Sequence, residues 1–246
     1  MYQEENKGHK EMKIECVIVC NNYSDFLEHT LPENIKYLDK VVVVTTPEDR
    51  ATRALCEKYS VDCIPTKVFF EDGDDFSKGR GTNLGLSHLR HDDWLLHIDA
   101  DIMLSHRFRK ALYYAKLDKE CIYGADRLNA VSYECWDGNK HKTVPGHQYR
   151  YLVPAPKEFP VGARLIHKEY GYCPIGFFQL WHSSKKRKYP INQGSAEHTD
   201  VLFSVQWERQ NRILLPELFV IHLESEMTKM GANWRKRVTK PFGKGK

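Results

Sequence analysis

Short apolar runs alternate with amphipathic segments along the first part of the chain. Three segments are mostly apolar, rich in β-branched side chains and short enough for buried strands, namely residues 14–20, 41–45 and 61–65. Between these runs, residues 24–38 and 48–59 carry apolar side chains at helical spacing. The alternation of strands and helices predicts a mostly parallel sheet with right-handed crossovers, and therefore an α/β fold.

Turn and cap residues mark the ends of these elements. Ser24 is placed to cap the first helix, and Pro32 is expected to break it. After an acidic loop at residues 71–75, residues 76–85 lead into a third helix that ends near Arg90. The second half is less regular, and its predicted elements are strands at 121–123, 176–181, 213–218 and 220–223 and a helix at 197–210.

Composition indicates a folded globular protein. Apolar residues make up 41% and charged residues 28% of the 246 positions, which excludes disordered and collagen-like classes. No apolar run approaches the roughly 18 residues of a membrane span, and the charged N-terminus lacks a secretory signal, so a cytoplasmic location is expected. The seven cysteines contain no Cys-x-x-Cys pair, which predicts reduced and mostly buried thiols.

Two aspartates lie in the most informative apolar run of the chain. Residues 94–104 read as a strand that runs into Asp99 and Asp101. Open α/β sheets bind ligands at the carboxyl ends of their strands, and a strand that continues this far would place both carboxylates on one face. Paired carboxylates suit Mg²⁺ or Mn²⁺, because these cations prefer oxygen ligands and are completed by substrate phosphates. The alternative is a helix-capping aspartate beside an exposed one.

Polar motifs stand at the predicted strand ends and before the third helix. They are Asn21-Asn22, Thr45-Thr46, Lys78-Gly-Arg-Gly-Thr-Asn83 and Asp99-Ala-Asp101. In this order they resemble the nucleotide-binding half of GT-A glycosyltransferases, especially the family 2 type, over about residues 13–105. The resemblance implies a metal at the Asp-x-Asp motif and donor contacts by Asn21, Asn22, Thr45, Thr46, Lys78, Asn83 and Asp99. Family members usually carry an aspartate after the second strand to meet the base, whereas Thr46-Pro-Glu-Asp49 stands here.

A weaker match lies in the second half of the chain. A Gly-rich strand that begins at Gly176 precedes an acidic motif at the start of a helix, and this order resembles the acceptor segment of GT-A enzymes. The resemblance implies that an acidic residue there takes the proton from the acceptor hydroxyl, a role that suits a nearby carboxylate. Asp200 is the first candidate for this base, Glu197 the second and His198 the third. The alternative is that these residues only stabilise the helix N-terminus.

The C-terminal part of the chain carries a histidine and then a basic tail. His222 ends the last apolar strand, where a purely structural role is the alternative to a functional one. The arrangement resembles several metal-dependent GT-A enzymes, in which a late histidine completes the metal site and basic residues neutralise the departing diphosphate. The resemblance implies that Asp101 and His222 are the direct metal ligands, with Asp99 nearer the ribose or a metal-bound water. The implied diphosphate contacts are Lys229, Trp234 and Arg235.

The sequence therefore predicts a GT-A-like, metal-dependent glycosyltransferase. It would use Mn²⁺ or Mg²⁺ and move a hexose or pentose from a nucleotide diphosphate donor to an acceptor hydroxyl. The basic run at residues 185–188 and the tail are compatible with a DNA acceptor that carries a hydroxymethylated base, while a glycan or a small molecule is the other acceptor class. The predicted parts are an N-terminal arm at 1–12, a nucleotide-sugar-binding half at 13–115, an acceptor-binding half of the same domain at 116–225 and a basic tail at 226–246.

Two other functions are consistent with parts of the same pattern. A sugar nucleotidyltransferase shares an α/β nucleotide site and metal carboxylates, but it normally has a Gly-rich triphosphate loop where Asn21-Asn22-Tyr23 stands. A non-catalytic nucleic-acid-binding domain would use the basic tail. Such a domain would bind with a steep salt dependence and would be indifferent to loss of Asp101.

Overall fold

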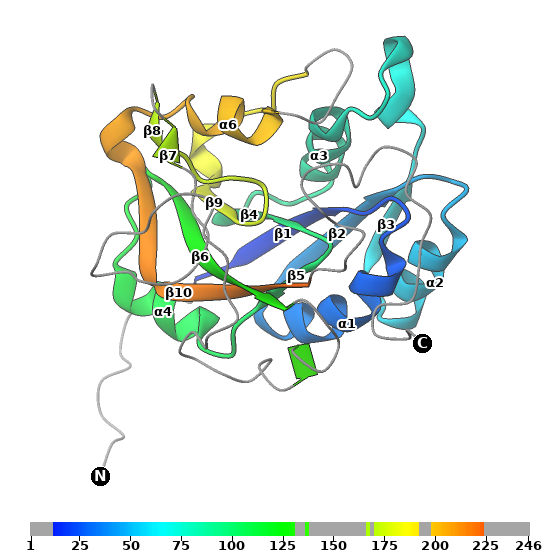
Figure 1. The fold of residues 1–246 in the computed structure, drawn as a ribbon, viewed down its shortest axis with the longest axis horizontal. Helices are drawn as coiled ribbons and strands as arrows, with labels where there is room; N and C mark the ends of the chain where they lie inside the picture. Colours follow the sequence, from blue (N-terminus) through cyan, green and yellow to red (C-terminus); the bar gives the residue numbers. More distant parts are fainter. Residues whose placement is uncertain (1–11, 131–135, 138–165, 168–169, 192–197, 224–246) are drawn as a thin grey trace.

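The computed structural model describes residues 12–130, 136–137, 166–167, 170–191 and 198–223 (Figure 1). Its core is one eight-stranded sheet with the order β3-β2-β1-β4-β9-β6-β10-β5. The strands of this sheet are β1 (Ile14–Val19), β2 (Lys40–Thr45), β3 (Asp62–Pro65), β4 (Trp94–Asp99), β5 (Ile102–Leu104), β6 (Ile122–Ala130), β9 (Gln179–His182) and β10 (Arg212–Leu223). The short strands β7 (Ile166–His167) and β8 (Gly171–Tyr172) pair with each other.

The sheet is parallel in its first half and mixed in its second half. β1 is parallel to both β2 and β4, and β2 is parallel to β3. β9 runs antiparallel between β4 and β6, β10 is parallel to β6, and β5 is antiparallel to β10. The predicted α/β fold with a mostly parallel sheet is confirmed. It follows from the pairing that β1, β2, β4 and β10 all end at the same edge of the sheet, which we call the carboxyl edge.

Helices cover both faces of the sheet (Figure 1). They are α1 (Ser24–Asn34), α2 (Arg50–Lys58), α3 (Lys78–Ser87), α4 (Phe108–Ala115) and α6 (Thr199–Ser204), with 3₁₀ turns at Ile35–Tyr37, Val68–Gly73, Ser183–Lys185 and Arg209–Asn211. Because side chains alternate along a strand, Cys16 and Ile18 of β1 pack in the core with α1, α2 and α4. Val17 points the other way and packs in the core with α3 and α6.

Several predicted boundaries were wrong by a few residues. Tyr23 is the N-cap of α1, so Ser24 is its first helical residue, and Pro32 lies inside the helix without breaking it. The helix predicted at 197–210 is only α6, followed by a 3₁₀ turn. The two strands predicted at 213–218 and 220–223 are the single strand β10, which contains a register shift in its pairing with β6.

The Asp-x-Asp segment is a turn between two strands rather than one continuous strand. β4 ends at Asp99, Ala100 and Asp101 form a turn, and β5 begins at Ile102. The expectation that both carboxylates share a strand face was therefore wrong. β4 and β5 are consecutive in the chain but stand in the fourth and eighth places of the sheet. The sheet therefore curls, and this turn joins its middle to its edge.

The described cysteines are all free thiols. Five of them are buried and Cys63 is half-buried, so the predicted reduced and mostly buried state is confirmed for these six, while Cys135 lies outside the described residues. Within the described ranges, none of the helices has both the length and the apolar character that a bilayer crossing requires.

Candidate active site

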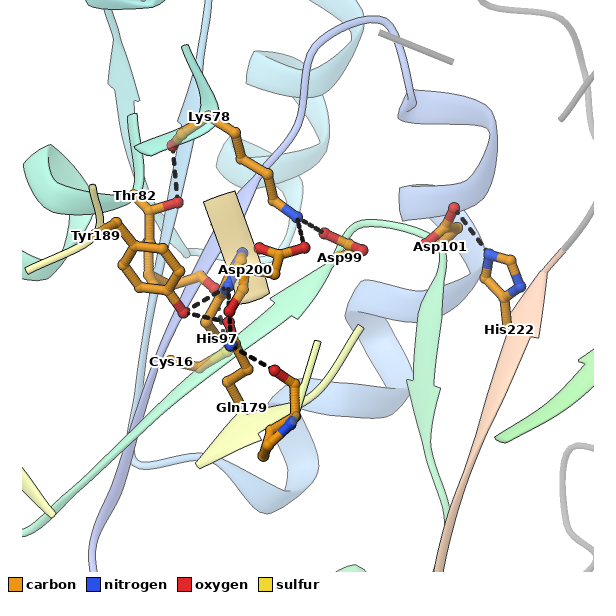
Figure 2. A network of polar contacts seen from close by, with 12 residues as sticks. Cys16, Lys78, Thr82, His97, Asp99, Asp101, Gln179, Tyr189, Asp200 and His222 are labelled. Atoms are coloured by element: carbon orange, nitrogen blue, oxygen red, sulfur yellow. Dashed lines mark hydrogen bonds and ion pairs between the residues drawn. The ribbon is translucent and has the colours of Figure 1, made fainter. Parts of the chain in front are cut away.

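Three charged side chains from three elements meet at the carboxyl edge, and we call them the Lys78 cluster: Lys78, Asp99 and Asp200. Lys78 is the first residue of α3, Asp99 ends β4, and Asp200 lies in the first turn of α6. Lys78 Nζ donates to Asp99 Oδ1 at 2.6 Å and to Asp200 Oδ2 at 3.5 Å (Figure 2). The cluster therefore joins a predicted donor lysine, one aspartate of the Asp-x-Asp motif and the first candidate base.

The charges within the Lys78 cluster stabilise one another. Burial opposes the ammonium form of Lys78, but the carboxylates of Asp200 and Asp99 outweigh that effect and raise the pKa of the lysine. Burial also opposes ionisation of Asp99, yet the nearby ammonium lowers the pKa of that carboxyl. Both shifts favour the charged forms of Lys78 and Asp99 at neutral pH. Asp200 Oδ1 is buried and has no hydrogen-bond partner in the described part of the chain.

The absence of a side chain at Gly176 makes room for the Lys78 cluster. A Cβ atom at this position would lie 2.3 Å from Asp200 Oδ2 and 2.4 Å from Lys78 Nζ. Those distances are far below ordinary contact, so any larger residue would move one of the two charged groups. The backbone of the predicted acceptor segment thus forms one wall of the cluster.

A neutral polar network lies beneath the Lys78 cluster. His97 of β4 is fully buried, and its Nδ1 lies 2.9 Å from the Tyr189 hydroxyl, which donates to Gln179 Oε1 at 2.6 Å (Figure 2). Burial, together with the Lys78 ammonium, lowers the pKa of His97 to about 4, so this imidazole is neutral at physiological pH. Burial and the carboxylates above raise the pKa of Tyr189 well beyond its usual range. These two residues therefore add no charge to the site.

A second pair of side chains lies at the same edge, on the other side of the turn. Asp101 Oδ2 is 3.4 Å from His222 Nε2, and Figure 2 shows this pair separate from the Lys78 cluster. The pairing of β5 with β10 brings the two residues together, since His222 stands opposite Ile102 and Leu223 N donates to Asp101 O. The structure thus places the two predicted direct metal ligands side by side, and it directs Asp99, the third residue predicted at the metal site, toward Lys78.

Polar side chains of α1 hold the turn that carries Asp101. Thr30 Oγ1 donates to Ala100 O at 2.7 Å, and the amide of Asn34 donates to Ile102 O at 2.7 Å and accepts from Leu104 N at 2.8 Å. Thr30 and Asn34 are both fully buried. Buried hydrogen bonds of this kind are costly to break, so the turn has a fixed geometry.

The Asp101–His222 pair is suited to a divalent cation. Asp101 Oδ1 is buried and has no hydrogen-bond partner within the described residues, and the pair offers one carboxylate and one imidazole. Mn²⁺ and Mg²⁺ accept oxygen ligands and retain sites for water and substrate phosphates, so two protein ligands are enough. The described ranges contain no group of three or more His, Cys, Asp or Glu side chains that could hold a metal without substrate.

The loops after β1 and β2 contact each other at the carboxyl edge. Thr46 Oγ1 donates to Asn21 Oδ1 at 3.2 Å, and Asn22 N donates to Asp49 Oδ2 at 2.7 Å. Thr45 is fully buried, and its hydroxyl donates to the same Asp49 oxygen. The structure thus brings together all four residues predicted to hold the nucleoside, although Thr45 is directed inward.

Asp49 explains the departure from the family pattern after the second strand. Its Oδ1 accepts from Thr52 N at 3.1 Å and caps α2, while its Oδ2 accepts from Thr52 Oγ1 at 2.7 Å. Asp49 is buried, and its hydrogen bonds hold the loops after β1 and β2 together from the protein interior. The order Asp-x-x-Thr before a helical pattern is an N-cap signal that could have identified this role from sequence.

Two other predicted donor and acceptor residues have defined surroundings. The amide of Asn83 exchanges hydrogen bonds with the backbone of Tyr189, at 2.9 Å and 2.8 Å, so it joins α3 to the acceptor half. His198 is the exposed N-cap of α6 and has a φ of 60°. Glu197, Lys229, Trp234 and Arg235 lie outside the described residues.

The acidic loop before α3 is neutralised by an arginine. Arg80 contacts the carboxylates of Asp72, Asp74 and Glu71, the last two at 3.4 Å and 3.6 Å. These ion pairs tie the loop to the helix that begins with Lys78. Because the arginine already occupies the carboxylates, we assign the loop a structural role.

Sequence reasoning missed the buried network of His97, Gln179 and Tyr189. The signal for His97 was a single polar residue in an otherwise apolar strand, Trp94-Leu-Leu-His-Ile. Gln179 and Tyr189 gave no such signal, because the former stands in a short aromatic strand and the latter in a loop.

Comparison with known proteins gives the fold a precedent. No family model and no curated protein matches the sequence. Mannosyl-3-phosphoglycerate synthase from Rubrobacter xylanophilus has a similar structure, with a TM-score of 0.51 and 16% identity over 87% of this chain and 66% of its own. Glucosyl-3-phosphoglycerate synthase from Mycobacterium tuberculosis, crystallised with phosphoglyceric acid, has a TM-score of 0.49 and 10% identity over 87% of this chain and 71% of its own.

A third solved structure belongs to 4-diphosphocytidyl-2C-methyl-D-erythritol synthase from Anaerococcus prevotii, with a TM-score of 0.43 and 12% identity over 94% of this chain and 92% of its own. The match to the Rubrobacter protein carries the conclusion about fold: the chain has a GT-A-like fold, as predicted. The chain spans just under two thirds of the length of that structure.

Proposed function

We propose that this GT-A-fold protein is a metal-dependent glycosyltransferase that moves a hexose or pentose from a nucleoside diphosphate donor to an acceptor hydroxyl. The observation that carries the proposal is the meeting of Asp101 and His222 beside the Lys78 cluster at one edge of the sheet. This edge is where open α/β sheets bind their ligands. A pair of side chains suited to a divalent cation, next to two carboxylates and an ammonium, fits a reaction that both releases a diphosphate and deprotonates a hydroxyl.

The donor would lie across the loops after β1 and β2. Asn21, Asn22 and Thr46 are the nucleoside contacts in this proposal, with Thr45 behind them. Lys78 would contact the donor from the start of α3, and Asn83 would act from behind by holding the segment at Tyr189. The proposed diphosphate contacts from the tail remain Lys229, Trp234 and Arg235.

Asp101 and His222 would hold Mn²⁺ or Mg²⁺, and Asp99 would lie near the ribose or a metal-bound water. When bound there, the cation would stabilise the negative charge of the departing diphosphate. Lys78 would add a fixed positive charge within the same edge. Fixed charges of this kind act strongly where water is excluded, because they need no reorganisation during the reaction.

Asp200 would be the base in an inverting transfer, with Glu197 and His198 as the second and third candidates. Its carboxylate would take the proton of the acceptor hydroxyl while the hydroxyl oxygen bonds to the anomeric carbon and the bond from that carbon to the diphosphate breaks. The buried Asp200 Oδ1 without a partner among the described residues supports this role. The neutral His97 beneath it does not compete for the proton.

The acceptor class follows less directly from the described residues. In the basic run, Lys185 is paired with Glu120, and Arg187 stands over the Trp207 ring at 5.7 Å, so two of the four cations are already engaged. We therefore rank a glycan or small-molecule acceptor before a hydroxymethylated base in DNA. Both classes belong in the acceptor search.

The test is nucleotide release from a panel of nucleotide sugars, with Mn²⁺, Mg²⁺ or a chelator, comparing the native protein with Asp101→Ala. Asp92→Ala is the matched control, because Asp92 is exposed and its carboxylate pairs with Lys13. Release from one donor that is lost with chelator and in Asp101→Ala, but kept in Asp92→Ala, supports the proposal. Pyrophosphate release from a nucleoside triphosphate and a sugar phosphate would overturn it in favour of a nucleotidyltransferase. Silence across the panel, without any donor-induced shift in melting temperature, would also overturn it.

A further inference from the structure

Gln179 contacts four other segments beneath the Lys78 cluster: β4, the stretch at Pro174, the loop at Tyr189 and α6. It is the first residue of β9, it is fully buried, and it stands directly opposite His97 in the pairing of β9 with β4. Its side-chain nitrogen lies 2.9 Å from Pro174 O, 3.0 Å from Ser204 Oγ and 3.1 Å from Asp200 O. A buried amide with this many partners has a single stable orientation.

The hydrogen bonds through Gln179 run in one direction. Tyr189 donates its hydroxyl proton to Gln179 Oε1, so the phenol oxygen is left to accept from His97 Nδ1. On the other side, Ser204 donates to Pro174 O, so its oxygen is free to accept from the Gln179 amide. Each group donates where its neighbour accepts, and a flipped amide would break the bonds on both sides.

The amide contacts α6 at both ends of one helical turn. Asp200 O and Ser204 Oγ are four residues apart, and Gln179 Nε2 is within hydrogen-bond distance of both. α6 has only six residues, so its place depends on tertiary contacts rather than on its own helical stability. Phe203 packs α6 through its ring, which stacks on Tyr189 at 3.8 Å and also contacts Trp181 and Trp207. The Gln179 amide adds a polar contact to the helix.

We propose that Gln179 is a positioning residue that fixes the rotation of α6 and so holds the Asp200 carboxylate at Lys78. A stacked pair such as Phe203 and Tyr189 keeps the helix against the sheet but allows it to slide. The hydrogen bonds from Gln179 to the backbone oxygen of Asp200 and to the hydroxyl of Ser204 remove that freedom. This inference rests on the proposed function for its effect on catalysis, while its structural content is independent of that function.

The kinetic test uses Gln179→Met, which keeps the length of the side chain and removes its hydrogen bonds. We expect kcat to fall about 100-fold, because misplacement of a catalytic group by an ångström has an effect of that size, while the KM for the donor stays within twofold. Tyr189→Phe keeps the stack on Phe203 and removes one link of the chain, so a loss of about fivefold is expected. Gln206→Met is the control, since the side chain of Gln206 is half-buried and donates to Lys188 O rather than to a residue of the Lys78 cluster.

The same substitution in an Asp200→Asn background separates positioning from general damage. If Gln179 acts through Asp200, Gln179→Met changes the residual kcat of Asp200→Asn by less than twofold. An equal loss in both backgrounds would overturn the proposal. Should Gln179→Met not fold, Tyr189→Phe in the two backgrounds gives the same comparison with a smaller effect.

Crystal structures of the native protein and of Gln179→Met test, without any activity assay, whether Gln179 holds the Asp200 carboxylate at Lys78. The proposal expects the distance from Lys78 Nζ to Asp200 Oδ2, 3.5 Å here, to lengthen in the variant. An unchanged distance would overturn the proposal, even in an active enzyme. A native protein with no transfer activity but a displaced Asp200 in the variant would instead overturn the proposed function and leave the positioning role standing.

Discussion

Asp99 and Asp101 are two residues apart, yet their surroundings are opposite. Asp99 lies 2.6 Å from an ammonium that it shares with Asp200, whereas Asp101 faces the imidazole of His222 and has one buried oxygen without a partner in the described residues. A cation at Asp99 would have to compete with Lys78, but a cation at Asp101 would not. One motif therefore supplies both a member of the Lys78 cluster and a candidate metal ligand.

The turn between the two aspartates is the physical reason for this difference. Asp99 ends β4 and points to the face covered by α3 and α6, with His97 beneath it. Asp101 begins the crossing to β5 and therefore meets the end of β10. Two side chains on one strand face would have shared one environment, and the two roles could not have separated.

The largest effect is expected for Asp200→Asn, which tests the role of the Lys78 cluster in the comparison of Asp99 with Asp101. The variant keeps the shape of the side chain and removes the proposed base, so we expect kcat to fall by about 10² to 10⁴. Donor binding, measured by calorimetry, should change little because the metal pair is intact. A variant within threefold of native activity would show that the Lys78 cluster has no proton-transfer role.

The second test compares His222→Gln with Lys78→Met in a titration with Mn²⁺. Loss of a direct ligand should raise the half-saturating Mn²⁺ concentration at least about tenfold, the lower end of the effect of outer-sphere partners. Lys78→Met should leave that concentration unchanged and raise the KM for the donor. If both variants shift the Mn²⁺ requirement equally, the two sites are one site and the comparison fails.

The third test moves the Lys78 cluster without changing its members. In Gly176→Ala the new methyl group would displace the mobile ends of Lys78 and Asp200, so activity should fall about tenfold with little change in melting temperature. Gly79→Ala is the matched control, because its methyl group would lie 2.2 Å from the Pro190 backbone oxygen. Gly79→Ala should clearly lower the melting temperature, whereas Gly176→Ala should change it little. Unchanged activity in Gly176→Ala would mean that the cluster geometry is irrelevant.

The smallest effect is expected for an ion pair that belongs neither to the Lys78 cluster nor to the Asp101–His222 pair, and it measures what such a pair contributes to stability. Asp39 accepts from Ile14 N at 2.8 Å and from Arg109 Nη2 at 2.5 Å, at the sheet edge opposite the carboxyl edge. Burial opposes the charge of Asp39, but the Ile14 amide and the Arg109 guanidinium outweigh it and lower the pKa of the carboxyl below its ordinary 3.8.

Since that pKa is lowered in the folded protein, the stabilisation is present above pH 3.8 and is lost as the pH falls through the folded value. Asp39→Asn should therefore be less stable than the native protein at neutral pH, by less than about 1 kcal/mol for a pair this exposed. The difference should diminish below about pH 4 in urea unfolding. A difference that is constant across this range would show that the charge of Asp39 is not its source.

The parallel half of the fold and the members of the site could largely be predicted from sequence. The first three strands, β1, β2 and β3, are short and mostly apolar and are separated by segments with helical spacing, and that pattern is local. A family resemblance led to the prediction that Asp101 and His222 lie together, and the structure places the two side chains 3.4 Å apart. The roles assigned to these residues remain predictions until the variants are measured.

The remaining features depend on contacts that no local pattern contains. The strand at Asp99 ends because Thr30 and Asn34 of α1 bind the backbone on either side of Asp101, far away in the sequence. The chain from His97 to Gln179 likewise joins distant segments through Tyr189. Burial makes each of these hydrogen bonds valuable, but burial is a property of the completed fold.

The curl of the sheet has a consequence for how the protein assembles. The parallel strands β1 to β4 are all present by residue 99, but β5 pairs in the described sheet only with β10, which is near the end of the described chain. Pairings this distant form late, because the intervening chain must first be closed into a loop. We therefore expect the pairing of β5 with β10, which brings Asp101 and His222 together, to form last during folding. A cation bound by both residues would then hold the end of β10 to the turn between β4 and β5, and it would stabilise the closed sheet more as its free concentration rises above its Kd.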